Sequence, residues 1–345
     1  MKHSTRFFKY TPLAILVAGL ALTGCSLSGS FNSSSSGNQV VQQTQDAAFS
    51  EFSQGFIERF WQHNPGYGVY VGYYKYDDKL IVPDDQAFAE QQAFYKGELL
   101  ALNQFEPKRL SPSLASDYYI LQNQLESALW YNDELKSGEW DPSNYNVAGV
   151  FGVILNTDYK PLNERLLTII TRMEKIPAYY EAAKRNLVNP TLTHTKLAIQ
   201  QNQGALGLFN GALKDKVAES TLSQAEKAKF DSRLKESTAA ISDYIEYLEG
   251  KLPKLEKSGG KDFRIGKKLY DEKFKLDIFS GYTAEQLYQK ALSEKSRVHA
   301  EMIIIADKLW PKYFGQKPAP AEPLKKIKAL IDHISVKHVQ RDKFV

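Results

Sequence analysis

Histidine is the side chain best suited to metal or acid–base chemistry here, and the spacing of the six histidines does not favour a metal site. His333 and His338 are the only close pair. Their separation of five residues would turn them about 140° apart on a helix, whereas metal-binding pairs are four apart and share a face. A lone histidine on a helix is more often a capping or surface group than a ligand. The isolated histidines are His3, His63, His194 and His299.

The sequence also lacks the short motifs of common catalytic and nucleotide sites, namely HExxH, GxSxG, GxxxxGK[ST] and GxGxxG. Asp77 and Asp78 are adjacent carboxylates, but neighbouring side chains on an extended chain point to opposite faces. We therefore interpret this pair as a solvated turn. No catalytic, cofactor-binding or metal-binding residue is predicted in this chain.

Cys25, the only cysteine, follows a pattern typical of a secretory signal. A basic start precedes an apolar run over 13–22, which is far shorter than the ~20 residues that span a bilayer. The following Leu22-Thr23-Gly24-Cys25 resembles the lipobox of bacterial lipoproteins. This resemblance implies cleavage before Cys25, a diacylglycerol on its sulfur and an acyl chain such as palmitate on the new amino terminus, which together suffice for stable anchoring. The alternative is an ordinary signal peptide with a chance cysteine.

Composition indicates a globular protein with a sizeable core, since 43% of its 345 residues are hydrophobic. Without the three basic residues of the signal, 41 Lys and Arg stand against 40 Asp and Glu. This near-neutral balance gives no support to a nucleic-acid partner, which needs a basic patch. Once Cys25 is modified, no thiol remains for a disulfide, a metal or nucleophilic attack.

The chain divides into a signal peptide at 1–24, a tether at 25–45 and a helical domain at 46–345. The tether is rich in Ser, Gln and Asn, so it buries too little apolar surface to offset the entropy of ordering. Ser26, rather than Asp, follows the cysteine. By resemblance to the sorting rule of Gram-negative lipoproteins, this favours the outer membrane if the source is Gram-negative. The protein is therefore expected on a membrane, facing the periplasm.

From Asp46 onward, apolar residues recur at helical spacing, which predicts an all-α fold. Gly250 is expected to end the helix that begins after Ser223. The last helix carries no stop signal, because its final residues, QRDKFV, contain neither Gly nor Pro. The predicted helix starts are Ser111-Pro112, Pro161, the Ser223/Glu226 and Thr283/Gln286 capping boxes, and Pro323. The stripe after Thr283 comprises Leu287, Ala291, Val298, Met302, Ile305 and Leu309.

The segment Asn64–Asp78, NPGYGVYVGYYKYDD, is unusual for its tyrosines and glycines. It also holds the one short β-rich stretch, Gly68–Tyr76. One interpretation is an aromatic loop that lines a peptide or glycan cleft. The other is a structural loop whose rings pack on helices and whose glycines make turns. We favour the second, because aromatic-rich segments more often pack than bind.

Six groups of residues follow one another along the chain at distinctive distances. They are Asn64-Pro65 with Gly72 and Asp77-Asp78; Ile176-Pro177-Ala178-Tyr179-Tyr180 with Asn186-Leu187 and Pro190; Thr195 with Ala198-Ile199 and Gly204; Phe263 to Lys267 with Tyr270; Tyr282 to Leu287; and Glu301-Met302. In this order they resemble the bacterial domain-of-unknown-function-885 family over nearly all of 46–345.

That family resembles all-helical zinc metallopeptidases related to carboxypeptidase Taq. The resemblance implies that a complete member, of about six hundred residues, carries an HExxH helix and an acidic ligand in its later half. There the two histidines would bind zinc and the glutamate would act as general base. No residue here matches that motif, so zinc is expected only in full-length relatives. The open-ended last helix would then mark a truncation, from a shortened gene product or an interrupted reading frame.

The sequence thus predicts a lipid-anchored, all-α envelope protein that corresponds to the N-terminal, non-catalytic half of a zinc-dependent peptidase. Alone, it is expected to hydrolyse nothing. Its expected partners are the membrane and either a peptide substrate or the missing C-terminal half. The alternative is a non-enzymatic helical lipoprotein that binds a peptide, a protein or the cell wall. A third alternative is a degenerate product without a function.

Overall fold

The computed structural model describes residues 35–340 and 343, and every regular element within them is helical. The predicted all-α fold is confirmed. A single isolated bridge, between Thr191 and Gly260, is the only β-type pairing in this part of the chain. None of the described helices combines the length and apolarity needed to cross a bilayer. The signal peptide and Cys25 lie outside the described residues.

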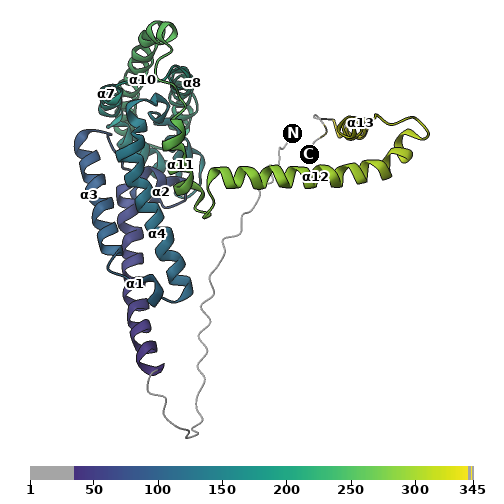
Figure 1. The fold of residues 1–345 in the computed structure, drawn as a ribbon. Helices are drawn as coiled ribbons and strands as arrows, with labels where there is room; N and C mark the ends of the chain where they lie inside the picture. The colour runs from purple at the N-terminus through teal and green to yellow at the C-terminus, as the bar shows by residue number, and fades with distance from the viewer. Residues whose placement is uncertain (1–34, 341–342, 344–345) are drawn as a thin grey trace.

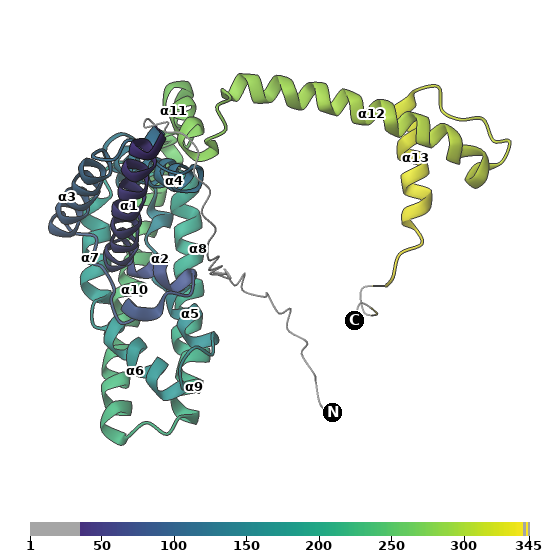
Figure 2. The ribbon, with the colours of Figure 1, turned by 90° about the horizontal axis from the view of Figure 1, so that it is seen from below.

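The body of the protein, residues 45–258, contains two hydrophobic cores (Figures 1 and 2). The helices of the body are α1 (Ser35–His63), α2 (Pro65–Tyr70), α3 (Asp85–Leu102), α4 (Pro112–Trp130), α5 (Ala148–Asn156), α6 (Leu162–Met173), α7 (Ile176–Asn186), α8 (Leu192–Leu208), α9 (Lys214–Glu219) and α10 (Gln224–Ser258). The first core joins α1, α3 and α4, where Phe49 and Leu125 are fully buried. The second joins α5 to α10, where Leu166 and Ile169 are fully buried.

A long arm projects from this body (Figures 1 and 2). Helix α11 (Gly266–Ile278) docks on α4, α12 (Ala284–Phe314) extends away from the body, and α13 (Pro323–Ser335) packs on its distal end. The arm has a small core of its own, formed by Ala306, Ile327 and Leu330 with half-buried neighbours.

The predicted helix starts are confirmed at each position. Ser223 caps α10, since its hydroxyl accepts from the backbone N–H of Glu226 while the Glu226 carboxylate accepts from the N–H of Ser223. Thr283 and Gln286 make the same reciprocal pair at α12. These bonds satisfy N–H groups that a helix start otherwise leaves without partners.

Two predicted helix ends are wrong, and helix α1 begins at Ser35, inside the segment predicted to be a tether. Helix α10 continues through Gly250 and ends at Gly259, whose φ of +77° gives the left-handed conformation of a helix stop. Burial of Leu248 and Leu255 offsets the roughly 1 kcal/mol cost of an interior glycine.

The second correction concerns the end of the last helix. Helix α13 ends at Ser335, and 336–340 are not helical. The His338 ring nitrogen Nδ1 lies 2.7 Å from the Ser335 carbonyl, one of the groups that the helix end leaves free. Val336 is 76% exposed, so no packing supports a further turn.

Candidate functional site

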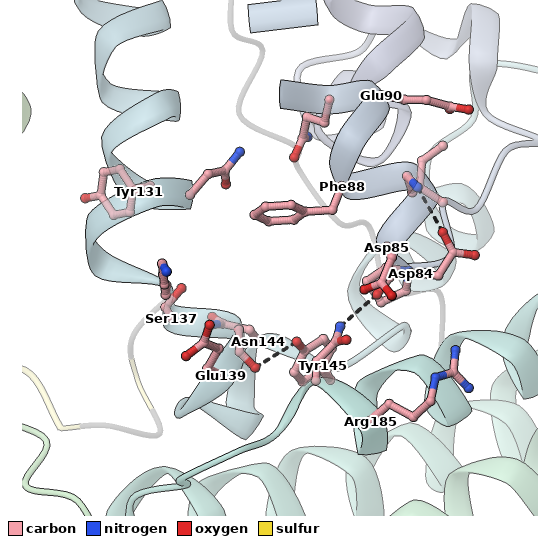
Figure 3. Close-up of a pocket in the computed structure, with 18 of the residues that line it drawn as sticks. Asp84, Asp85, Phe88, Glu90, Tyr131, Ser137, Glu139, Asn144, Tyr145 and Arg185 are labelled. Carbon is pink, nitrogen blue, oxygen red and sulfur yellow. Dashed lines mark hydrogen bonds between the residues drawn. The ribbon is translucent and has the colours of Figure 1, made fainter. Parts of the chain in front are cut away.

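A cleft with a volume of about 960 Å³ lies between α3 and the chain that follows α4 (Figure 3). Its first wall is the start of α3 with the loop before it. Its second wall comprises the π-helix η3 (Tyr131–Leu135) and the short helices η4 (Ser137–Glu139) and η5 (Pro142–Asn144). The end of α7, with Arg185 and Asn186, also lines it.

The backbone of the second wall departs from regular geometry in two ways. A π-helical turn ends α4, and π-turns are frequent at functional sites. Lys136 follows it in the left-handed region, with φ of +48°, a conformation that is uncommon for a residue with a side chain. Beside it, the Tyr145 hydroxyl donates to the carbonyl of Gly138 at 2.9 Å, and a Cβ on Gly138 would lie only 2.9 Å from that hydroxyl. A side chain at Gly138 would therefore displace the Tyr145 hydroxyl.

Exposed apolar side chains give the cleft a surface that a ligand can cover. Phe88 points from α3 into the middle of the cleft and is 48% exposed (Figure 3). Ile81 is 44% exposed and Val188 is 75% exposed on the same lining. Large apolar side chains left open in a concave site are typical of ligand pockets.

The charges around the cleft are mixed, with an excess of carboxylates. Arg185 makes no ion pair with any residue that the structure describes. The Asp84 carboxylate has a structural role, because it caps α3 by accepting from the N–H of Ala87 at 2.9 Å. Five carboxylates line the cleft against three cations, so it favours a ligand with positive charge. The carboxylates are Asp84, Asp85, Glu90, Asp133 and Glu139, and the cations are Lys79, Lys136 and Arg185.

His63 is the one histidine of the cleft lining. Its ring stacks on Phe94 with centroids 4.1 Å apart, and burial lowers its pKa although Glu90 and Glu98 oppose that shift. At neutral pH the imidazole is therefore uncharged and can both donate and accept a hydrogen bond.

No described histidine shares a hydrogen bond, an ion pair or a ring contact with another. The Nδ1 atom of His194 lies 2.7 Å from the Thr191 hydroxyl, and its Nε2 lies 3.8 Å from Asp141. His299 lies on α12, and His333 packs against the rings of Tyr313 and Phe314. Across 35–340 no three His, Cys, Asp or Glu side chains are placed to hold a metal.

The tyrosine-rich segment Asn64–Asp78 packs on the body and does not line the cleft. It is helical where it is regular, as α2 and η1 (Tyr74–Tyr76). The Tyr74 ring stacks on Tyr159 at 3.6 Å. Glu58 accepts from Lys75, Tyr73 and Tyr76, and these hydrogen bonds lower its pKa to about 2. The segment is thus held to α1, as the structural interpretation expects.

The interpretation of Asp77 as part of a solvated turn is wrong, although Asp78 is exposed. Asp77 is 4% exposed and accepts from the Tyr159 hydroxyl at 2.7 Å and from Lys160 at 2.9 Å. Its backbone carbonyl accepts from Arg172, which is itself 1% exposed. Burial lowers the pKa of this guanidinium to about 10, so it stays charged at neutral pH. The buried carboxylate is stabilised because it accepts hydrogen bonds from Tyr159 and Lys160, which lie just before α6. Arg172, on α6, binds the backbone carbonyl of the same residue.

The cleft residues were not predicted from the sequence. Phe88, Glu139 and Arg185 come from three elements far apart along the chain, and no short motif contains them. The one local signal is Asp84, an N-cap residue directly before a helical pattern.

Over the described residues the protein is all-helical, with a lateral cleft in its body and a projecting arm. The model of a bacterial family of unknown function, DUF885, matches residues 65–343. The chain belongs to this family. No curated protein matches the chain.

A solved structure shows the same fold. It is described as "a putative lipoprotein of unknown function" from Shewanella oneidensis, and shares 46% sequence identity at a TM-score of 0.79. The match covers 86% of this chain and 54% of that one, so the present chain corresponds to about half of that lipoprotein's length.

Proposed function

We propose that this chain is the substrate-binding, non-catalytic half of a lipid-anchored envelope peptidase, and that its cleft binds a peptide segment with basic and apolar side chains. The cleft carries this proposal. It has the volume of a ligand site, an exposed phenylalanine at its centre and an excess of carboxylates on its walls. An aromatic side chain in such a position is typical of residues that contribute most to binding.

The peptidase part of the proposal rests on the family resemblance and on the length of the solved relative. The side chains of the described residues do not fit a zinc site, since no three potential ligands lie together. We therefore derive no hydrolytic step through a metal on this chain. Any zinc and its general base would belong to the part of a complete relative that the present chain does not match.

The binding experiment uses the mature chain and two peptides of equal length, one basic and apolar, the other with its basic residues replaced by glutamate. Fluorescence anisotropy should show binding of the basic peptide only. Phe88→Ala should weaken it about tenfold, in line with loss of a central aromatic contact. Phe263→Ala is the matched control, since Phe263 is 47% exposed and lies outside the cleft. Equal affinity for both peptides, or an unchanged affinity in Phe88→Ala, argues against this ligand class.

The lipid anchor is tested separately, by mass spectrometry of the mature amino terminus. We expect cleavage before Cys25 and a mass increase from diacylglycerol and a further acyl chain. An unmodified Cys25, or membrane attachment that survives Cys25→Ala, contradicts the anchor. The periplasmic face is expected from the same signal, and the outer membrane from Ser26 if the source is Gram-negative; fractionation tests both.

The second candidate is a non-enzymatic lipoprotein that binds a peptide, a protein or the cell wall. The observation that favours it is that the walls of the cleft come from several elements of the described body. Adding the unmatched part of the solved lipoprotein distinguishes the two candidates. Chelator-sensitive peptide hydrolysis by the mixture supports the enzyme, and peptide binding without hydrolysis supports the binding protein.

A further inference from the structure

The arm leaves an apolar helix face without a partner. We define the arm stripe as Leu287, Ala291, Val298 and Ile305, which fall within about 40° of one another around a helix. None of the residues from Ala284 to Glu301 is buried. Leu287 is 36% exposed, Val298 37% and Ile305 54%. Such continuous helical patterning normally marks a buried face.

Helix α13 covers only the distal part of this face. Ala306 of α12 packs with Ile327 and Leu330 of α13. Met302 and Leu309 of the predicted stripe pack against this small core, whereas the four residues of the arm stripe lie outside it. The proximal half of α12 projects from the body (Figures 1 and 2), and its large apolar side chains are exposed.

The polar side of the arm forms many ion pairs of its own. Arg297 contacts the carboxylates of Glu294 and Glu301, and Lys326 of α13 pairs with Asp307 of α12 at 2.5 Å. Helix α12 carries five basic and four acidic residues, so it offers no strongly cationic face to anionic lipid. What the arm stripe lacks is an apolar polypeptide packed against it.

We propose that the arm stripe is the docking surface for the helical polypeptide that completes a full-length family member. The family match extends through residue 343 and so includes the arm. About half of the solved lipoprotein's chain lies outside its match to this protein, which is ample polypeptide to cover one helix face. This inference rests on the proposed function only in requiring a complementary half, and not on the peptide cleft.

The test mixes the mature chain with the larger unmatched segment of the Shewanella lipoprotein, produced as a separate polypeptide. We expect a one-to-one complex by sedimentation. The double variant Val298→Glu/Ile305→Glu should bind at least about a hundredfold more weakly, because it places charge in an apolar contact. Ser293→Glu/Ala300→Glu is the matched control, with two exposed positions on the opposite face of α12. Circular dichroism checks that each variant folds.

A second measurement covers the case in which the separate segment does not fold. The unmatched segment is fused after residue 343, and single cysteines replace Val298 or Ser293 in a chain that begins at Ser26. Maleimide should label Val298→Cys at least about tenfold more slowly in the fusion than in the chain alone, while labelling of Ser293→Cys stays unchanged. Equal protection at both positions, or at neither, overturns the proposal.

Two other outcomes also overturn it. Self-association of the chain alone that the Val298→Glu/Ile305→Glu variant abolishes would assign the arm stripe to a second copy. Binding of the delipidated chain to anionic vesicles that the Val298→Glu/Ile305→Glu variant abolishes would assign the arm stripe to a membrane. Because Phe88→Ala leaves the arm intact, failure of peptide binding and failure of docking are observed independently.

Discussion

Helices α10 and α12 begin in the same way and end in different surroundings. Each is opened by a reciprocal capping box, and they are 35 and 31 residues long. Helix α10 buries eight side chains against α6, α7 and α8, whereas α12 buries two, both in its distal half. Local sequence thus specifies where a helix starts, while burial of its apolar face depends on whether another element lies against it.

The comparison also shows what holds an unpacked helix together. Isolated helices are marginal in water, and most helical stability in proteins comes from tertiary packing. Helix α12 lacks that packing over its first five turns, so its capping box, its ion pairs spaced three and four residues apart and the small core with α13 must support it. The body therefore provides the stability of the molecule, and the arm contributes a surface.

The largest expected effect is the difference in the free energy of unfolding between one substitution in the body and one in the arm. Ile169→Ala in the body removes a fully buried side chain and should lower the free energy of unfolding by about 2–5 kcal/mol. Ile305→Ala in the arm removes a side chain that is 54% exposed and should change it by less than about 0.5 kcal/mol. Urea titrations followed by circular dichroism measure both. Similar losses would mean that the arm stripe is already packed.

The second prediction compares two arginines. Arg172→Met should cost about 2 kcal/mol, because the backbone carbonyls of Asp77 and Lys79 lose a buried donor. The loss is moderated because Arg172 Nε is itself buried without a partner. Arg297→Met in the arm breaks only exposed ion pairs and should cost less than about 0.5 kcal/mol.

Hydrogen exchange locates this effect. In Arg172→Met the amides of 74–80 should exchange faster, because that segment loses its anchor to α6. An unchanged exchange rate there would show that Asp77, Tyr159 and Lys160 hold the segment without the guanidinium.

A smaller effect is expected at the junction between the regions. The Trp130 indole N–H donates to Glu272 of α11 at 2.9 Å, and the Tyr131 hydroxyl donates to Asp277 at 2.8 Å. Trp130→Phe keeps the ring and removes one of these bonds, so we expect a loss of about 1 kcal/mol that is confined to α11. Faster proteolysis within 259–283, with an unchanged unfolding midpoint of the body, is the expected result. A lower midpoint of the body would show that the two regions unfold together.

The smallest effect concerns Glu58 and pH. Hydrogen bonds from Lys75, Tyr73 and Tyr76 lower its pKa from 4.5 to about 2 in the folded protein. A lowered carboxyl pKa contributes stability above the unfolded-state value, and this contribution is lost as the pH falls through the folded-state value. The gap in urea midpoint between the wild type and Glu58→Gln should therefore be present at pH 7 and close between pH 4.5 and 2. A gap that persists at pH 2 would contradict this assignment.

The sequence by itself determined the helical class, the positions of the capped helix starts and the family to which the chain belongs. These follow from short-range patterns: Ser223 and Glu226 lie three residues apart and satisfy each other's backbone groups whatever surrounds them. The same local rules failed at helix ends. Helix α10 passes through Gly250 and α13 ends at Ser335, because packing outweighs propensities of about 1 kcal/mol.

Only the tertiary structure decided which apolar stripes are buried and where a ligand could bind. The local pattern predicts that Asp77 is solvated, but the fold buries it. Its partners Tyr159, Lys160 and Arg172 lie more than eighty residues away along the chain. The cleft unites Phe88, Glu139 and Arg185 through the packing of α3, the end of α4 and α7. The stripe of α12 has the same periodicity as a core helix. A helical period specifies that a face is apolar, whereas its burial requires a second surface, which lies elsewhere in the chain or in another molecule.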